Sequence, residues 1–111
     1  MARVYSTQLA EVVGLGAGST QIGLVPAGNV WVVRHATATF AANTALPLQG
    51  FTLKTGTDVA LWIVGPLGVA TVRPYDYSGR HVLVAGEGLY FDSGDPADWE
   101  IIVSGYQLTL P

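Results

Sequence analysis

The stretch that organises this chain is Val25-Pro26-Ala27-Gly28-Asn29-Val30-Trp31-Val32-Val33-Arg34-His35-Ala36-Thr37-Ala38-Thr39-Phe40. It opens with a turn, because proline biases the residue before it toward extended geometry and glycine is a strong turn former. A long run rich in valine, threonine and aromatic residues follows, and such residues favour strands. The sequence therefore predicts a tight turn that leads into one long β-strand.

A shortened echo of this stretch recurs near the other end of the chain. With one residue removed, 24–31 and 83–90 both read as an apolar pair, an Ala-Gly turn, a polar residue and an aromatic strand. The echo predicts a pair of similar turns at the sheet edges, as two Greek keys would give. The alternative interpretation is that any glycine turn between two β-rich runs has this form.

Glycine and proline separate the remaining β-rich runs, with 14 glycines and 6 prolines among 111 residues. Strands are expected within 3–13, 19–25, 30–40, 46–54, 57–64, 68–73, 80–84, 88–91 and 99–110, and a turn-rich loop at 74–79. Spacings of about 8–12 residues between strands are typical of sandwiches and small barrels. We expect residues 1–111 to form a single all-β domain, an antiparallel, jelly-roll-like β-sandwich of about eight short strands with almost no helix.

Composition limits the classes of function. Hydrophobic residues make up 50% of the chain and charged residues 12%, which excludes a disordered protein. The net charge of −3, with 5 scattered Lys and Arg, argues against a nucleic-acid partner, and the absence of cysteine excludes disulfides and thiolate metal sites. No apolar run approaches the ~18 residues of a membrane span, and no secretory signal is present. We expect a soluble protein that is made in the cytosol and has no membrane partner.

The long strand has apolar residues on both of its faces. Its even positions from Val30 to Phe40 suit a core except for Arg34, whereas its odd positions become polar after Trp31 and Val33. The run 57–64 has the same excess, with these residues on its two faces: Val59, Leu61 and Ile63 against Ala60, Trp62 and Val64. Because a sandwich strand alternates when its second face meets water, something should cover these second faces.

A neighbouring subunit is a better cover than the short loops of this chain. We therefore predict a homo-oligomer, a trimer by symmetry analogy, and we expect interface contacts from Trp31, Val33, Trp62 and Val64. On this interpretation, Trp31→Ala weakens assembly more than it weakens folding.

The last strand changes phase. Trp99, Ile101 and Val103 are apolar at odd positions, but the apolar residues after Gly105 stand at even ones. A β-bulge at Gly105, or a bend where the strand crosses between sheets, gives this shift. We predict an irregularity at that position.

Signals for phosphate binding, metal binding and catalysis are weak. The run 14–18 has the glycines of a phosphate-binding loop, but a strand follows it and no lysine closes it, which favours a plain turn. His35 and His81 are the histidines of the chain, and neither belongs to a His-x-His pair, so surface or sheet-edge positions are expected. No serine stands in Gly-x-Ser-x-Gly. We predict no enzyme activity and no cofactor or metal.

Acidic residues gather between Glu87 and Glu100. The segment Asp92–Asp98 reads as ordinary turn chemistry and is expected to be a solvent-facing rim, although a calcium site is conceivable because hard oxygen ligands cluster in such loops.

Three segments together resemble a group of small virion proteins encoded among the structural genes of tailed phages, especially phages of actinobacteria. The segments are Val25-Pro26-Ala27-Gly28-Asn29-Val30-Trp31-Val32-Val33-Arg34, Val82-Leu83-Val84-Ala85-Gly86-Glu87-Gly88-Leu89 and Val103-Ser104-Gly105-Tyr106-Gln107-Leu108. The resemblance implies a compact β-sandwich that serves as a minor tail or head-decoration protein and carries no catalytic residues. It also implies assembly in the host cytoplasm into the virion.

These observations lead to an expected function as a structural virion component that binds copies of itself and other virion proteins. The alternative is a carbohydrate-binding module for host surface glycans, because exposed aromatic rings stack on sugars. Tyr75 and Tyr77, in the expected loop at 74–79, are its candidate contacts.

Overall fold

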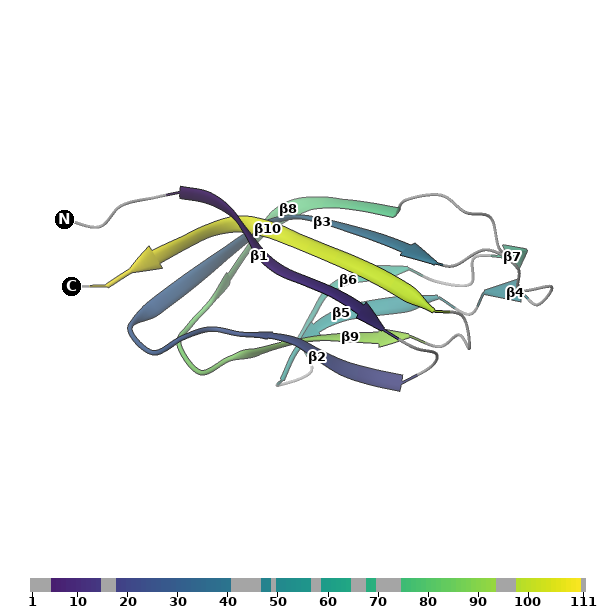
Figure 1. Cartoon of the computed structure of the whole chain (residues 1–111), viewed down its shortest axis with the longest axis horizontal. Helices are drawn as coiled ribbons and strands as arrows, with labels where there is room; N and C mark the ends of the chain where they lie inside the picture. The colour runs from purple at the N-terminus through teal and green to yellow at the C-terminus, as the bar shows by residue number, and fades with distance from the viewer. Residues whose placement is uncertain are drawn as a thin grey trace.

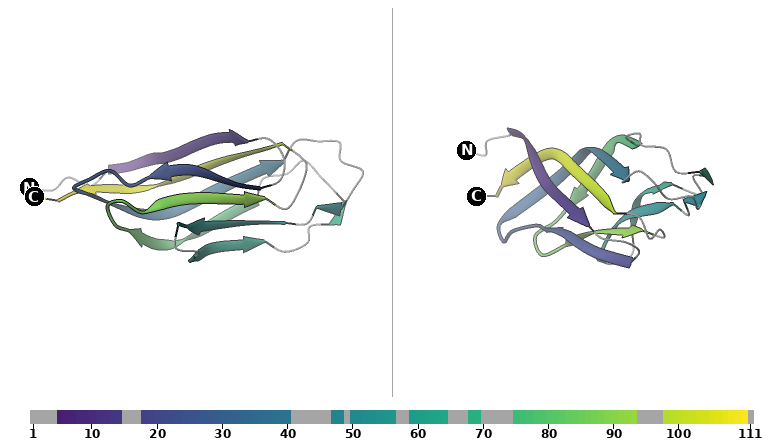
Figure 2. Two further views of the ribbon diagram at one scale, coloured as in Figure 1. Left: turned by 90° about the horizontal axis from the view of Figure 1, so that it is seen from below. Right: turned by 45° about the vertical axis from the view of Figure 1, so that its right-hand side comes forward.

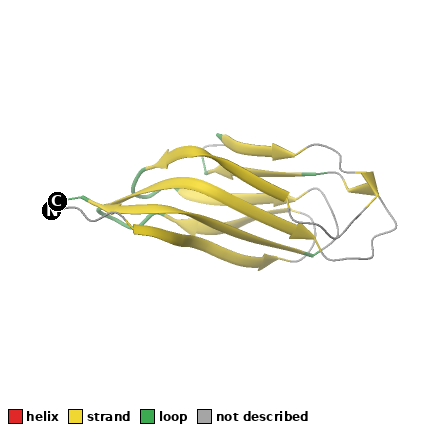
Figure 3. Cartoon of the chain, turned by 90° about the horizontal axis from the view of Figure 1, so that it is seen from above, coloured by secondary structure: helices red, strands yellow, loops and turns green. Residues whose placement is uncertain are grey.

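The structure is a computed structural model that describes residues 5–14, 18–40, 47–48, 50–56, 59–64, 68–69, 75–93 and 98–110. All regular structure within these ranges is β-strand, and none of it is helix (Figure 3). The prediction of an all-β fold is confirmed.

The strands of the described ranges form two four-stranded antiparallel sheets and one small pair. Sheet A contains, in spatial order, β1 (Tyr5–Gly14), β10 (Trp99–Thr109), β3 (Asn29–Phe40) and β8 (Tyr75–Leu83). Sheet B contains β2 (Gly18–Leu24), β9 (Gly88–Ser93), β5 (Phe51–Thr55) and β6 (Ala60–Val64). The small pair joins β4 (Pro47–Leu48) to β7 (Gly68–Val69). Figures 1 and 2 show sheets A and B as two layers that face each other.

The strand order is that of a jelly roll. The first strand pairs with the last, and the pairing continues inward through β2 with β9, β3 with β8 and β5 with β6. Two further pairs, β10 with β3 and β9 with β5, join these nested hairpins into the two sheets. This arrangement corresponds to two Greek keys rolled into a sandwich, as expected.

The two turns predicted from the sequence echo lie side by side at one end of the sandwich. In the β2–β3 turn the Asn29 amide donates to the Pro26 carbonyl at 3.2 Å, and in the β8–β9 turn the Glu87 amide donates to the Val84 carbonyl at 3.1 Å. Each turn has a glycine at its third position with positive φ, 75° at Gly28 and 86° at Gly86, which a type II turn requires. Val25 joins the turns, since its amide donates to Glu87 and its carbonyl accepts from Gly86, both at 3.0 Å. The echo therefore marks a pair of equivalent crossovers between the sheets.

The core between the sheets contains a chain of aromatic rings. Ring centroids lie 4.4 Å apart for Phe91 and Trp99, 5.1 Å apart for Phe91 and Phe51, and 4.7 Å apart for Phe51 and Trp62. Trp62 then stacks on Tyr77 of β8 at 5.7 Å. The chain of rings runs from sheet A through sheet B and back to sheet A. It holds the two layers together through contacts beyond simple area burial.

The strand β3 changes its inward phase halfway along. Trp31 and Val33 are buried in the first half, and Ala36 and Ala38 are buried in the second. The register to β10 passes from Gly105↔Val33 to Ser104↔His35, so Arg34 is an extra residue on β3. A bulge of this kind moves the next side chains to the opposite face. The even-face assignment to the core was therefore right for the second half of β3 and wrong for the first.

The predicted irregularity at Ser104-Gly105 is confirmed, but the extra residue lies on the partner strand. A Cβ added to Gly105 would collide with the carbonyl oxygen of Val32, because the bulge at Arg34 brings the β3 backbone close. Glycine at this position permits the close approach of the two strands. The glycine in the sequence thus signals a bulge in its neighbour.

The turn-rich loop predicted at 74–79 was wrong over its described part, because 75–79 belongs to β8. Tyr75 and Tyr77 alternate with polar Asp76 and Ser78, and the tyrosines face the core while the polar residues face out. Alternation of this kind is typical of a half-buried strand. In the sequence, Gly79 at the end of the alternating run suggests a turn instead.

Candidate functional site

The outer face of sheet A carries apolar side chains at the end where the two turns lie. Because Trp31 and Val33 face the core, Val30 and Val32 face outward. Val32 lies opposite Tyr106 of β10 and Val82 of β8, and Val30 lies opposite Leu108. Directly opposed residues share a face of a sheet. We call this set the outer patch: Val30, Val32, Val82, Tyr106 and Leu108.

Two arginines border a hollow in the outer patch. The hollow has a volume of about 210 Å³ and is lined by Val32, Arg34, Arg80, Tyr106 and Leu108. Val32 is 8% exposed and forms its floor, whereas Arg34 and Arg80 are exposed. Both arginines lie at the register shift between β3 and β8. Within the described part of the chain neither arginine forms an ion pair with a carboxylate. The hollow therefore offers an apolar floor beside two positive charges.

The structure places Trp31 and Val33 in the core of a single chain. Trp31 is 5% exposed, and its indole Nε1 donates to Gln107 Oε1 at 2.9 Å. Its ring packs so closely against Gly23 that an added Cβ there would lie 3.0 Å away. Val33 is fully buried. Neither side chain is available to another subunit, so the outer patch takes the place of these residues as the candidate contact surface.

Trp62 and Val64 also face inward. Val64 lies opposite Phe51 and Trp62 opposite Leu53, and both pairs are on the core side of β5 and β6. Each of the two is half-buried against the core. The large apolar side chain that is exposed on this strand is Ile63, at 69%. The four predicted interface residues thus divide between the core and its margin, and the structure does not bring them together as one surface.

A single signal in the sequence identifies the outer patch. Arg34 is the one charged residue on the face of β3 that the alternation assigned to the core. If Arg34 is read as a bulge residue, the phase of Trp31 and Val33 reverses, and Val30 and Val32 come to the outside. A charged residue in an otherwise apolar phase can mark an inserted residue rather than a tolerated exception.

Further along the same outer face, His35 belongs to a polar network between β3 and β8. His35 Nδ1 lies 3.3 Å from Ser78 Oγ, and Thr37 Oγ1 donates to Asp76 Oδ1 at 2.8 Å. His35 Nε2 lies 3.8 Å from the same Asp76 oxygen. These groups stand on an exposed sheet surface, and they contrast with a catalytic triad, in which a buried acid orients the histidine. The network serves as cross-strand pairing.

The predicted histidine positions agree with the structure, since His35 is exposed and His81 lies half-buried on the edge strand β8. Of the acidic segment Asp92–Asp98, residues 94–97 lie outside the described residues. Asp92 belongs to β9 and pairs with Lys54 at 3.5 Å, and Asp98 is exposed. Among the described residues no group of three or more acidic or histidine side chains is placed to hold a metal ion.

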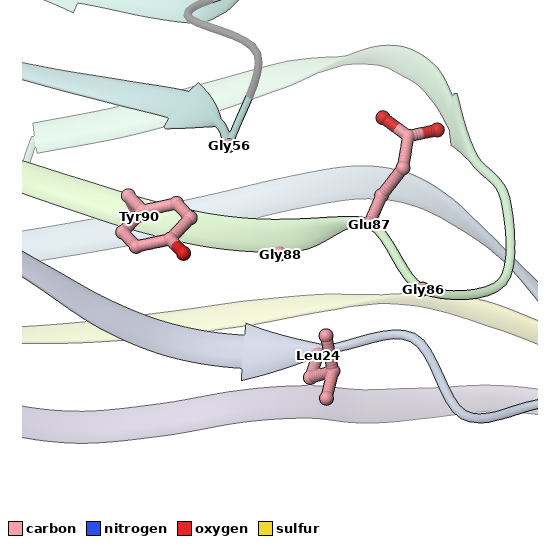
Figure 4. Close-up of a pocket in the computed structure, with 6 residues that line it drawn as sticks. All are labelled: Leu24, Gly56, Gly86, Glu87, Gly88 and Tyr90. Atoms are coloured by element: carbon pink, nitrogen blue, oxygen red, sulfur yellow. The ribbon is translucent and has the colours of Figure 1, made fainter.

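A second concave feature lies on sheet B. This groove has a volume of about 300 Å³, and its lining comes from the end of β2, the β8–β9 turn, β9 and the residue after β5. We call it the Tyr90 groove, and its lining is Leu24, Gly56, Gly86, Glu87, Gly88 and Tyr90 (Figure 4). None of these residues was expected to form this groove, although Glu87 stands at the start of the acidic cluster at 87–100. The sequence feature that indicates the groove is Gly88-Leu89-Tyr90. A glycine two positions before an aromatic residue leaves bare backbone next to the ring, on the same face of the strand.

No known protein family has a pattern that matches this chain, and no curated protein is similar enough to be identified as a relative. In the ranges that the structure describes, no helix has the length and apolar character to cross a membrane. The outer patch and the Tyr90 groove are therefore the features from which a function is inferred.

Proposed function

We propose that this protein is a non-enzymatic structural module that works by docking, a small component of a tailed-phage virion placed on the tail or the capsid surface. The observation that supports this function best is the outer patch with its two arginines. An apolar surface of this kind is typical of a protein contact when it is bordered by charges that, like these arginines, form no ion pair within the described residues.

The partner should present an apolar side chain flanked by carboxylates. Arg34 and Arg80 line the hollow, and arginine forms strong paired hydrogen bonds with carboxylates at interfaces. A second copy of the chain can meet this requirement, because the chain carries 8 acidic residues against 5 basic ones. Asp76 and Glu11 are exposed. We therefore keep a homo-oligomer, with a trimer preferred, as part of the proposal, together with contacts to other virion proteins.

Sedimentation of a matched pair of variants tests the docking surface. Val82 is 52% exposed in the outer patch, and Val82→Lys adds a third positive charge there. Ile63 is the matched control, since it is also exposed on an edge strand but belongs to sheet B. We expect the wild type to associate at micromolar concentration. The dissociation constant should be about tenfold higher or more for Val82→Lys, whereas Ile63→Lys should associate like the wild type.

Two results would contradict the proposal. One is a monodisperse wild-type monomer that also fails to bind purified particles of the phage that encodes it. The other is an equal loss of association in Val82→Lys and Ile63→Lys while both variants melt at the wild-type temperature, because the outer patch would then contribute no more than sheet B. The virion assignment itself is tested by mass spectrometry of purified particles with localisation to head or tail, and absence of the chain from the particle would overturn it.

The second candidate function is a carbohydrate-binding module. The tyrosines first considered for it do not suit the role, because Tyr75 is buried in the core and Tyr77 stacks on Trp62. The observation that favours this function is instead the half-buried ring of Tyr90 at the groove on sheet B.

A further inference from the structure

We propose that the Tyr90 groove is a binding subsite for one neutral sugar ring, on the sheet opposite the outer patch. The inference is independent of the docking function, because the groove and the outer patch are built from different sheets. The site would give the module a polysaccharide or glycan ligand in addition to its protein contacts.

The ring of Tyr90 lies against bare backbone. A Cβ added to Gly88 would lie 2.8 Å from Tyr90 Cε2, and one added to Gly56 would lie 3.2 Å from the same atom. Any larger residue at Gly88 would therefore push the ring away from the sheet. Gly88 precedes Tyr90 on β9 and Gly56 directly follows the neighbouring strand β5, and an aromatic ring that covers glycine backbone stabilises a sheet. Figure 4 shows the ring close to face-on, with its hydroxyl pointing along β9 toward Gly88. The ring forms a fixed aromatic platform beside the groove.

Polar side chains of different kinds surround this platform. Tyr90 lies directly opposite Lys54 on β5 and Gln21 on β2, so an amine and an amide share its face. One oxygen of the Glu87 carboxylate, Oε1, accepts from the Val84 amide at 2.9 Å, which fixes the side chain at the edge of the groove. Donors and acceptors close to an aromatic surface match sugar hydroxyls, each of which both donates and accepts.

The chemistry of the groove selects among ligand classes. Because Asp92 is paired with Lys54, the remaining charge at the groove is the Glu87 carboxylate, which disfavours phosphates and thus nucleic acids. The apolar lining consists of Leu24 and the tyrosine ring, which is too little for a lipid chain. A volume of about 300 Å³ is at the lower limit for a ligand pocket and suits a single ring. The C–H face of a pyranose carries a partial positive charge, which is attracted to the negative face of an aromatic ring.

Amide NMR titration of the wild-type protein is the first test. The probes are gluco-, galacto- and manno-oligosaccharides and oligomers of N-acetylglucosamine, each added to about 10 mM because a shallow single-ring site binds in the millimolar range. We expect at least one probe to shift the amide signals of Gly56, Gly86 and Gly88, with no shifts at Val82 and Leu108. This measurement needs no variant and so does not depend on the folding of one.

Variants then assign the binding to the ring. Tyr90→Ala should lower the affinity for the probe by about tenfold or more. Tyr90→Phe keeps the ring and should change the affinity by less than about threefold. Val13→Ala is the control, because Val13 is exposed on β1 of sheet A and belongs to neither surface, and this variant should bind like the wild type. The proposal is overturned if no probe shifts the groove amides, or if Tyr90→Ala remains folded and binds as well as the wild type. Either failure would leave the association measured for the docking function unchanged.

Discussion

The inner and outer faces of the first half of β3 differ in what apolar side chains do there. On the inner face Trp31 and Val33 are buried by the chain itself, and the indole has its hydrogen bond to Gln107. On the outer face Val30 and Val32 join Tyr106 and other apolar residues around a hollow with two arginines. Both faces carry large apolar side chains, so hydrophobicity alone does not distinguish the core face from the outer face. The phase set by the bulge at Arg34 does.

The largest expected effect comes from removal of Trp31. Trp31→Ala deletes a buried indole and should lower the free energy of unfolding by about 3–5 kcal/mol, because a cavity forms where the ring packed on Gly23. Urea unfolding measures this loss. The result would reverse the expectation drawn from the sequence, in which Trp31→Ala weakened assembly more than folding.

Val82→Ala on the outer face is the control for this comparison. It should change the unfolding free energy by about 0.5 kcal/mol or less, as for an exposed surface position. If instead Trp31→Ala unfolds at the same urea concentration as the wild type and dissociates an oligomer, the inner face of β3 is the contact face and the comparison fails.

Much of the fold follows from the sequence, and the site follows only in part. The strands near 5–14, 18–24 and 29–40 were predictable because glycine and proline mark the turns between them. The paired turns at Gly28 and Gly86 were predictable because positive φ demands glycine. The residues that form a turn are neighbours along the chain, so a turn can be recognised directly in the sequence.

The outer patch could not be predicted with the same ease, because its position depends on one inserted residue. Alternation gives the relative orientation of neighbours but not the position at which the phase slips. Arg34 marks the slip on β3, while the glycine that accommodates it is Gly105, a long way off in the sequence on β10. Long-range compensation of this kind leaves no local pattern. The Tyr90 groove was missed for a similar reason, since Gly56 and Gly88 meet only in the folded sheet.

The second largest effect should come from Gly105. Gly105→Ala places a Cβ against the Val32 carbonyl, and backbone cannot move aside as a side chain does. We expect a loss of about 3 kcal/mol in urea unfolding, at the upper end for overpacking. Ser104→Ala, one position earlier and half-buried, should cost about 0.5 kcal/mol or less. Equal stability of the two variants would mean that β10 does not approach a bulge in β3, and the two faces of β3 would then keep one phase along its length.

The smallest effect on stability should come from Gln107, which accepts the hydrogen bond of the Trp31 indole on the inner face of β3. Gln107→Ala removes the acceptor of the Trp31 indole N–H, which is part-buried and would remain without its partner. The expected cost is about 1 kcal/mol, because water can reach a group that is not fully enclosed. A double-mutant cycle with Trp31→Phe isolates this contact, since phenylalanine has no N–H to satisfy. In the Trp31→Phe background, Gln107→Ala should cost almost nothing. A full cost of about 1 kcal/mol in both backgrounds would assign the role of Gln107 to packing rather than to its hydrogen bond with the indole.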